Sequence, residues 1–127
     1  KNDFFFISGD VTYLIEGKVF NLKPGDIILI NSKELHQAII NNKDATYERI
    51  VLWLNRSFLK RLSNDETDLT LCFESPNKKN VLRVSFEKQQ NIRLILNKLS
   101  SLQNYKGIGY ELLYKAYITE LMVHINN

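Results

Sequence analysis

The chain has 127 residues, enough for one domain that buries a core of its own without support from disulfides or metal. Its 17 basic and 14 acidic residues give a net charge of +3 with no basic stripe, which argues against nucleic-acid binding by this chain itself. The sequence contains no apolar run long enough to span a membrane, and its single cysteine, Cys72, is typical of a protein of the reducing cytoplasm.

Up to about residue 55, apolar residues come in short runs rich in Val, Ile, Phe and Tyr, separated by Gly, Asn, Asp and Pro. This pattern predicts β-strands at residues 3–8, 10–16, 18–22, 26–30, 36–42 and 46–55. Pro24 and Gly25 occupy the second and third positions of a predicted type II turn, where glycine accepts the positive φ. Several short strands joined by tight turns favour a sandwich or a barrel.

From Arg56 onward the apolar spacing becomes helical. We expect a short helix after Arg56, then a mixed segment over residues 64–84 with one short helix near Leu69. Ser85 is a predicted N-cap of a longer helix that ends near residue 103. Two glycines, Gly107 and Gly109, break the chain before a second long helix. The apolar face of the first long helix contains Ile92, Ile95, Leu96, Leu99 and Leu102, and that of the second contains Leu112, Leu113, Ala116, Tyr117, Leu121 and Ile125.

The order of these elements, together with the residues at their turns, resembles the N-terminal cupin domain of AraC-type transcription regulators. The resemblance covers nearly the whole chain, because two long helices also follow the cupin barrel in that family. The residues that carry it are Ser8-Gly9, Tyr13-Leu14-Ile15-Glu16-Gly17-Lys18, Leu22-Lys23-Pro24-Gly25-Asp26-Ile27, Glu34-Leu35-His36, Tyr47-Glu48-Arg49-Ile50-Val51-Leu52 and Phe58-Leu59.

The resemblance implies a mainly β fold, a cupin-like (double-stranded β-helix or jelly-roll) barrel followed by an antiparallel helix pair. Residues 1–55 would form the barrel, 56–84 a short helix with a connecting segment, and 85–127 a two-helix dimerisation segment, all in one domain. It also implies a cytoplasmic homodimer that senses a small-molecule effector. DNA would be contacted only through a helix-turn-helix part that is not in this chain, and the abrupt apolar start after Lys1 also indicates a piece of a longer protein.

Many cupins are metal enzymes, so a metal-dependent enzyme is the alternative function. An open metal site takes three or four protein ligands, and this chain has two histidines, His36 and His124, on different predicted elements. Asn2 stands where the cupin motif usually has its glutamate. We therefore predict no catalytic residues, no metal, no cofactor and no enzymatic activity.

Alternation along residues 46–55 places Tyr47, Arg49, Val51 and Trp53 on one strand face. A guanidinium, an indole and a phenol together suit a polar ligand that stacks on aromatic rings, such as a sugar or, alternatively, a small carboxylated metabolite. In arabinose-type relatives the residues that match Arg49, Val51 and Trp53 face the ligand cavity. The predicted ligand-binding residues are Arg49, Trp53, His36, Ser8, Val51 and Tyr13.

Each of these residues also has a structural interpretation. Arg49 could pair with Glu48 or Glu16 at a barrel rim, Trp53 could belong to the core, and His36 could be a hydrogen-bonded barrel histidine. The facing of Tyr13 depends on whether a bulge follows Ser8. If these interpretations hold, the domain is an oligomerisation scaffold without a ligand.

The two terminal helices offer more apolar residues than one helix pair can hide in itself, which favours a second copy as the cover. The alternative is that both helices pack on the barrel. The predicted dimer interface contains Leu113, Tyr117, Leu121, Leu96 and Leu99.

Overall fold

The computed structural model describes residues 2–127, apart from the side chains at positions 5 and 7. Lys1, where the predicted barrel region begins, lies outside the described residues. All six predicted strands are confirmed, with bounds that differ from the prediction by at most two residues. The strands are β1 (Asn2–Ser8), β2 (Val11–Ile15), β3 (Lys18–Asn21), β4 (Ile27–Ile30), β5 (His36–Ile40) and β6 (Glu48–Leu54).

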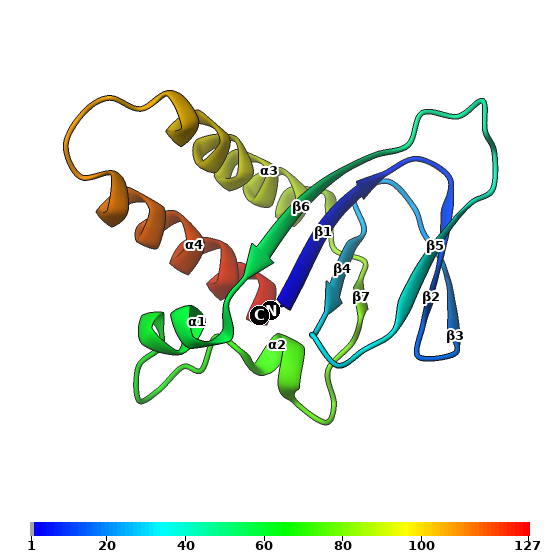
Figure 1. Ribbon diagram of the computed structural model, residues 1–127, viewed down its shortest axis with the longest axis horizontal. Coiled ribbons are helices and arrows are strands. Elements are labelled where there is room, and N and C mark those ends of the chain that lie inside the picture. The colour runs from blue at the N-terminus through cyan, green and yellow to red at the C-terminus, as the bar shows by residue number, and fades with distance from the viewer. Residues whose placement is uncertain (1) are drawn as a thin grey trace.

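In residues 2–127 the strands form two antiparallel sheets. One has four strands in the order β6-β1-β4-β7, where β7 (Val81–Leu82) is a short strand that the sequence pattern did not predict. The other has three strands in the order β3-β2-β5. Figure 1 shows the three-stranded sheet on one side of the four-stranded sheet and the long helices on the other.

The helices also agree with the prediction. α1 (Arg56–Leu62) begins at the N-cap Asn55, and the short α2 (Leu71–Glu74) follows it. α3 (Phe86–Ser101) begins at Ser85, whose side chain accepts a hydrogen bond from the Lys88 amide, and it continues into a 3₁₀ turn (Leu102–Asn104). α4 (Tyr110–Asn126) begins after Gly109 and runs back beside α3 in the opposite direction (Figure 1). None of the helices described here is long and apolar enough to cross a membrane.

Two hydrophobic clusters divide the core between the two faces of the four-stranded sheet. The cluster on the helix side joins this sheet to all the helices and includes Phe4, Phe6, Leu54, Ile92, Ile118 and Leu121. The cluster between the two sheets includes Val11, Tyr13, Ile15, Ile28 and Ile30, with Tyr47 and Val51 packed against it. Successive residues of β4 alternate between the clusters, as the strand geometry requires.

Candidate functional site

Three polar side chains meet between the two sheets, beside the between-sheet hydrophobic cluster. Tyr13 comes from β2 of the three-stranded sheet, while Tyr47 precedes β6 and Arg49 lies on it. The hydroxyl oxygens of Tyr13 and Tyr47 are 3.1 Å apart, and Arg49 Nη1 donates a 3.2 Å hydrogen bond to the Tyr13 hydroxyl. We call these residues the polar trio. It joins the two sheets across the space between them.

Local structure explains why the trio meets. Gly9, with φ +116°, turns the chain between β1 and β2, and its lack of a side chain lets Thr46 and Tyr47 pack against it. Tyr13 pairs with Ala38 of β5, whose methyl group is the smallest side chain available beside the phenol apart from glycine. This small neighbour leaves room for the Tyr13 side chain to point toward β6.

Burial governs the electrostatics of the trio. Burial of Tyr13, with a further contribution from its hydrogen bond to Tyr47, raises the pKa of the phenol to about 12, although Arg49 acts in the opposite direction. The hydrogen bond to Tyr13 is the main cause that raises the pKa of Arg49 above its usual value. At neutral pH Arg49 is therefore a cation and the Tyr13 phenol is neutral, so that this phenol can both donate and accept hydrogen bonds.

Two further predicted ligand residues, Trp53 and His36, are exposed on the strands β6 and β5. Trp53 is on β6 with Arg49 and Val51 on its face, and its side chain is 68% exposed. His36 is exposed at the start of β5 and pairs with Ile15, so it shares a face with Tyr13 and Ala38. Val51 packs against the between-sheet cluster. The structure thus brings Arg49, Val51 and Tyr13 together between the sheets, whereas Trp53 and His36 share strand faces with them and are exposed.

Ser8 lies outside the between-sheet cluster and lines a small pocket of about 110 Å³ to which Arg49 and Arg93 also contribute, so its ligand role stays a prediction. It pairs with Glu48 on β6, and its face of β1 carries Phe4 and Phe6, both in the helix-side cluster. Its hydroxyl group donates a 3.4 Å hydrogen bond to the Glu48 carbonyl oxygen. Ser8 therefore lies on the face of the sheet opposite to Arg49.

Tyr47 is the member of the site that the sequence prediction left out of its ligand residues. The signal was present, because the alternation of residues 46–55 already placed Tyr47 on the face of Arg49. What the alternation could not show is that a phenol from β2 would meet it, since that contact joins residues 34 positions apart.

The two histidines that the alternative enzyme function would need as metal ligands lie on different elements. His36 is at the start of β5 and His124 is on α4. Within residues 2–127, no group of three or more His, Cys, Asp or Glu side chains is arranged to hold a metal ion.

The predicted dimer residues are distributed over two environments. Leu121 is fully buried and Leu96 is buried in the helix-side cluster, whereas Leu99 and Tyr117 are half-buried and pack against it. Leu113 is also half-buried. Leu121 and Leu96 must therefore be removed from the predicted interface, because the chain's own core already covers them.

The exposed apolar residues of α4 lie on a neighbouring stripe instead. Leu112 is 73% exposed and Val123 is 41% exposed, and the small exposed Ala116 lies between them. With the half-buried Thr119 these positions are spaced by four, three and four residues, which is the spacing of a helix–helix seam.

Comparison with known proteins agrees with this architecture. The family model described as "AraC-like ligand binding domain" matches residues 5–122, which is nearly the whole chain. A search of curated proteins gave no match. The matched range contains both sheets, the polar trio and most of α4. The chain therefore belongs to the family of AraC-like ligand-binding domains, the effector-binding cupin domains of AraC-type transcription regulators.

Proposed function

We propose that this domain senses a small polar effector, a sugar or a small carboxylic acid, in the space between its two sheets. Arg49 is the fixed polar anchor, the two phenols of the trio supply hydrogen bonds, and Trp53 with His36 closes the open edge over the ligand. The role is regulatory and not catalytic, and no metal or cofactor takes part. The domain acts in the cytoplasm and influences DNA through a helix-turn-helix part outside this sequence.

The polar trio is the observation that carries this proposal. Arg49 is an exposed guanidinium that a hydrogen bond to the buried Tyr13 phenol holds in one position at the edge of the two sheets, where an effector can reach it. Arg49 can offer two parallel N–H groups to a carboxylate or to neighbouring hydroxyls. The exposed indole of Trp53 offers a flat surface for the C–H face of a sugar ring.

A thermal-shift screen of sugars and small acids tests the proposal and identifies the effector class. A ligand that binds only the folded domain, at a hundredfold over its Kd, adds about 2.7 kcal/mol to the free energy of unfolding. We expect the identified effector to bind Arg49→Ala with a loss of about 1.5–3 kcal/mol, measured by isothermal titration calorimetry.

Arg61→Ala is the matched control, because Arg61 is an exposed arginine on α1 that contacts the Phe58 ring away from the between-sheet space. It should bind the effector as the unmodified domain does. If folded Arg49→Ala keeps full affinity, the anchor role is refuted. If a hit depends on added metal and turns over, the domain is a cupin enzyme, and if no small molecule binds at all, it is a scaffold.

A second part of the proposal is that two copies associate through α4. It is supported by the exposed stripe of Leu112, Ala116 and Val123, with Leu113, Tyr117 and Leu99 at its margins. Two copies held at a fixed spacing would place two DNA-binding parts at the spacing of a repeated operator.

A further inference from the structure

A groove of about 580 Å³ lies on the helix side of the four-stranded sheet, away from the polar trio. Its walls are β7 with the segment before it, the end of α2, the first turn of α3 and the last turn of α4. Its floor is apolar, with Leu82, Val84 and Ile125 over the buried Leu29. These residues pack with the helix-side cluster, while Val81, which also lines the groove, packs against the between-sheet cluster, so the groove lies at the β7 edge of the sheet.

The charged residues that line the groove are all basic. They are Lys78, Lys79, Arg83 and Lys88, and no Asp or Glu belongs to the described lining. Lys78 is neutralised by Glu34 at 2.8 Å, and Arg83 is neutralised by the buried Asp26 at 2.8 Å.

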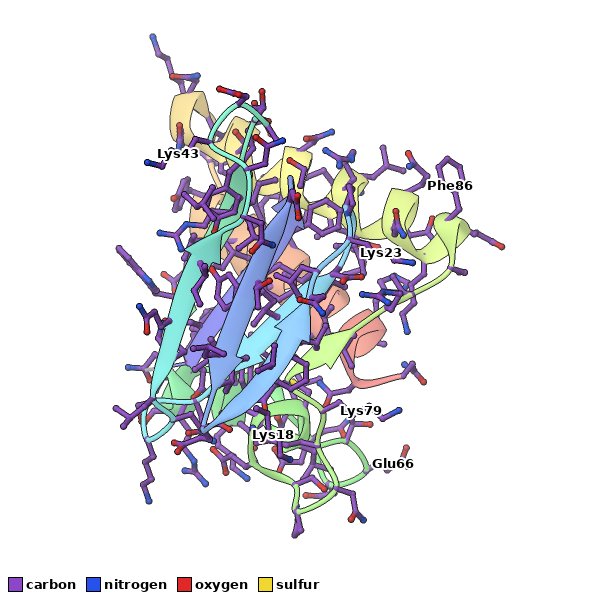
Figure 2. All side chains as sticks on the ribbon, turned by 90° about the vertical axis from the view of Figure 1, so that its right-hand side faces the viewer. Lys18, Lys23, Lys43, Glu66, Lys79 and Phe86 are labelled. Atoms are coloured by element: carbon purple, nitrogen blue, oxygen red, sulfur yellow. The ribbon has the colours of Figure 1, made fainter. Side chains whose placement is uncertain are left out.

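Lys79 therefore keeps a charge that no carboxylate balances in the described part of the chain, and Lys88 contacts the last residue of the sequence, Asn127. Lys79 is exposed, and Figure 2 shows it at the opposite end of the molecule from Lys43. Lys88 Nζ donates a 3.1 Å hydrogen bond to the main-chain oxygen of Asn127, beside the groove. The groove thus combines an apolar floor with two ammonium groups at its rim.

The wall that carries Lys79 is held in place from both ends. Glu34 accepts hydrogen bonds from Lys78 and from Asn80, and Asp26 accepts two from Arg83. The Asn80 side chain also donates to the Leu29 carbonyl oxygen. Because the segment around β7 is fixed on β4, the groove exists before any ligand arrives, which lowers the entropic cost of binding.

We propose that this groove is a second ligand site and that it binds an amphipathic monocarboxylate. An apolar body of about ten carbon atoms lies on the floor, and the carboxylate meets Lys79 and Lys88. A neutral sugar would leave the apolar floor without a partner, and a cation would be repelled by the rim. The proposal does not depend on what binds between the sheets.

Naphthoate is a suitable probe, because its neutral isostere naphthamide keeps the apolar body and removes the charge. Binding is measured by isothermal titration calorimetry on the unmodified chain and on Lys79→Gln with Lys88→Gln. We expect naphthoate to bind at least about tenfold more tightly than naphthamide, and the double variant to lose about tenfold in naphthoate affinity. Lys43→Gln with Lys106→Gln, two exposed lysines that do not line the groove, should leave the affinity unchanged.

Amide chemical shifts locate the probe. Naphthoate should shift the amides of Cys72, Leu82, Val84 and Asn126 and leave those of Tyr13 and Arg49 in place. The proposal is overturned if the shifts gather on β2 and β6, if naphthamide binds equally well, or if the groove variant binds like the unmodified chain. It is also overturned if the groove variant changes the sedimentation coefficient, since the groove would then be covered by a second copy, or if an acidic peptide binds there and naphthoate does not.

Discussion

Tyr13 is the residue on which the between-sheet site is centred. Its side chain is fully buried, it contacts Tyr47 and Arg49, and its phenol has a pKa of about 12 against an ordinary value of 10.0. In the unfolded chain the phenol loses its proton near the ordinary value. The folded chain therefore holds a proton over a range of pH in which the unfolded chain does not.

This difference predicts an alkaline instability that belongs to one residue. Because the folded-state pKa is raised, the contribution of Tyr13 to stability is complete below about pH 10 and is lost as the pH rises through about 12. Between these values the unmodified chain should lose on the order of 2 kcal/mol more unfolding free energy than Tyr13→Phe. Urea unfolding at a series of pH values measures both curves. Lysine titration affects both proteins alike, so parallel curves would contradict the prediction.

Period-two alternation predicted which residues of one strand share a face, but it could not predict what covers each face. Period-two alternation correctly placed Arg49, Val51 and Trp53 on one face, because β6 has no bulge to reset it. The same rule could not place Ser8. Alternation predicts which residues share a face with Ser8. Contacts between β1 and the α3–α4 pair decide which face of the sheet the helices cover.

At the scale of elements, the β1–β2 turn sets the position of the trio. A Cβ atom at Gly9 would lie 2.7 Å from the Thr46 carbonyl oxygen and 2.9 Å from the Tyr47 Cα, and φ there is +116°. A Cβ atom at Gly17, where φ is +79°, would meet nothing within 4 Å. A substitution at Gly17 therefore tests backbone strain alone, whereas one at Gly9 adds a steric clash.

We expect Gly17→Ala to lower the free energy of unfolding by about 1 kcal/mol, because alanine is strained in the left-handed conformation. Gly9→Ala should cost more than about 2 kcal/mol, because the turn or the Tyr47 backbone has to move as well. Gly9→Ala should also weaken effector binding, since Tyr47 would leave its hydrogen-bonding distance to Tyr13. Thermal unfolding and calorimetry of both variants check this. If the two variants lose the same free energy of unfolding, the loop before β6 adapts to the added methyl group and does not fix the position of the trio.

Elements fixed by local signals were predictable, and elements fixed by distant contacts were not. Ser85 and the helical spacing after it were enough to predict α3. β7 has only two residues, and it exists because it pairs with β4 and because Glu34 and Asp26 hold the residues on either side of it. Those contacts join residues that are 44 to 57 positions apart, so no local pattern signals them.

At the scale of the whole molecule, the four-stranded sheet is a wall between the proposed effector space and the helices. β6 and β4 contribute side chains to both clusters, so a change in how they pack around an effector is felt by α3 and α4 on the other side. This arrangement gives a physical route from the trio to the exposed stripe of α4. Under the proposed function, the state of association is the output that we expect effector binding to change.

Substitutions in the exposed stripe of α4 test whether two copies associate through it. Leu112→Glu with Ala116→Glu places two carboxylates on the exposed face near the start of α4, where negative charge is compatible with the helix dipole. The double variant should therefore stay folded but sediment as a monomer at micromolar concentration, while the unmodified chain sediments as a dimer. Leu94→Glu, at an exposed leucine of α3, is the matched control and should stay dimeric. Leu121→Glu should instead unfold the domain, because it buries a carboxylate in the helix-side core. An unmodified chain that remains a monomer at high concentration, or a Leu94→Glu variant that dissociates in its place, would move the interface away from α4.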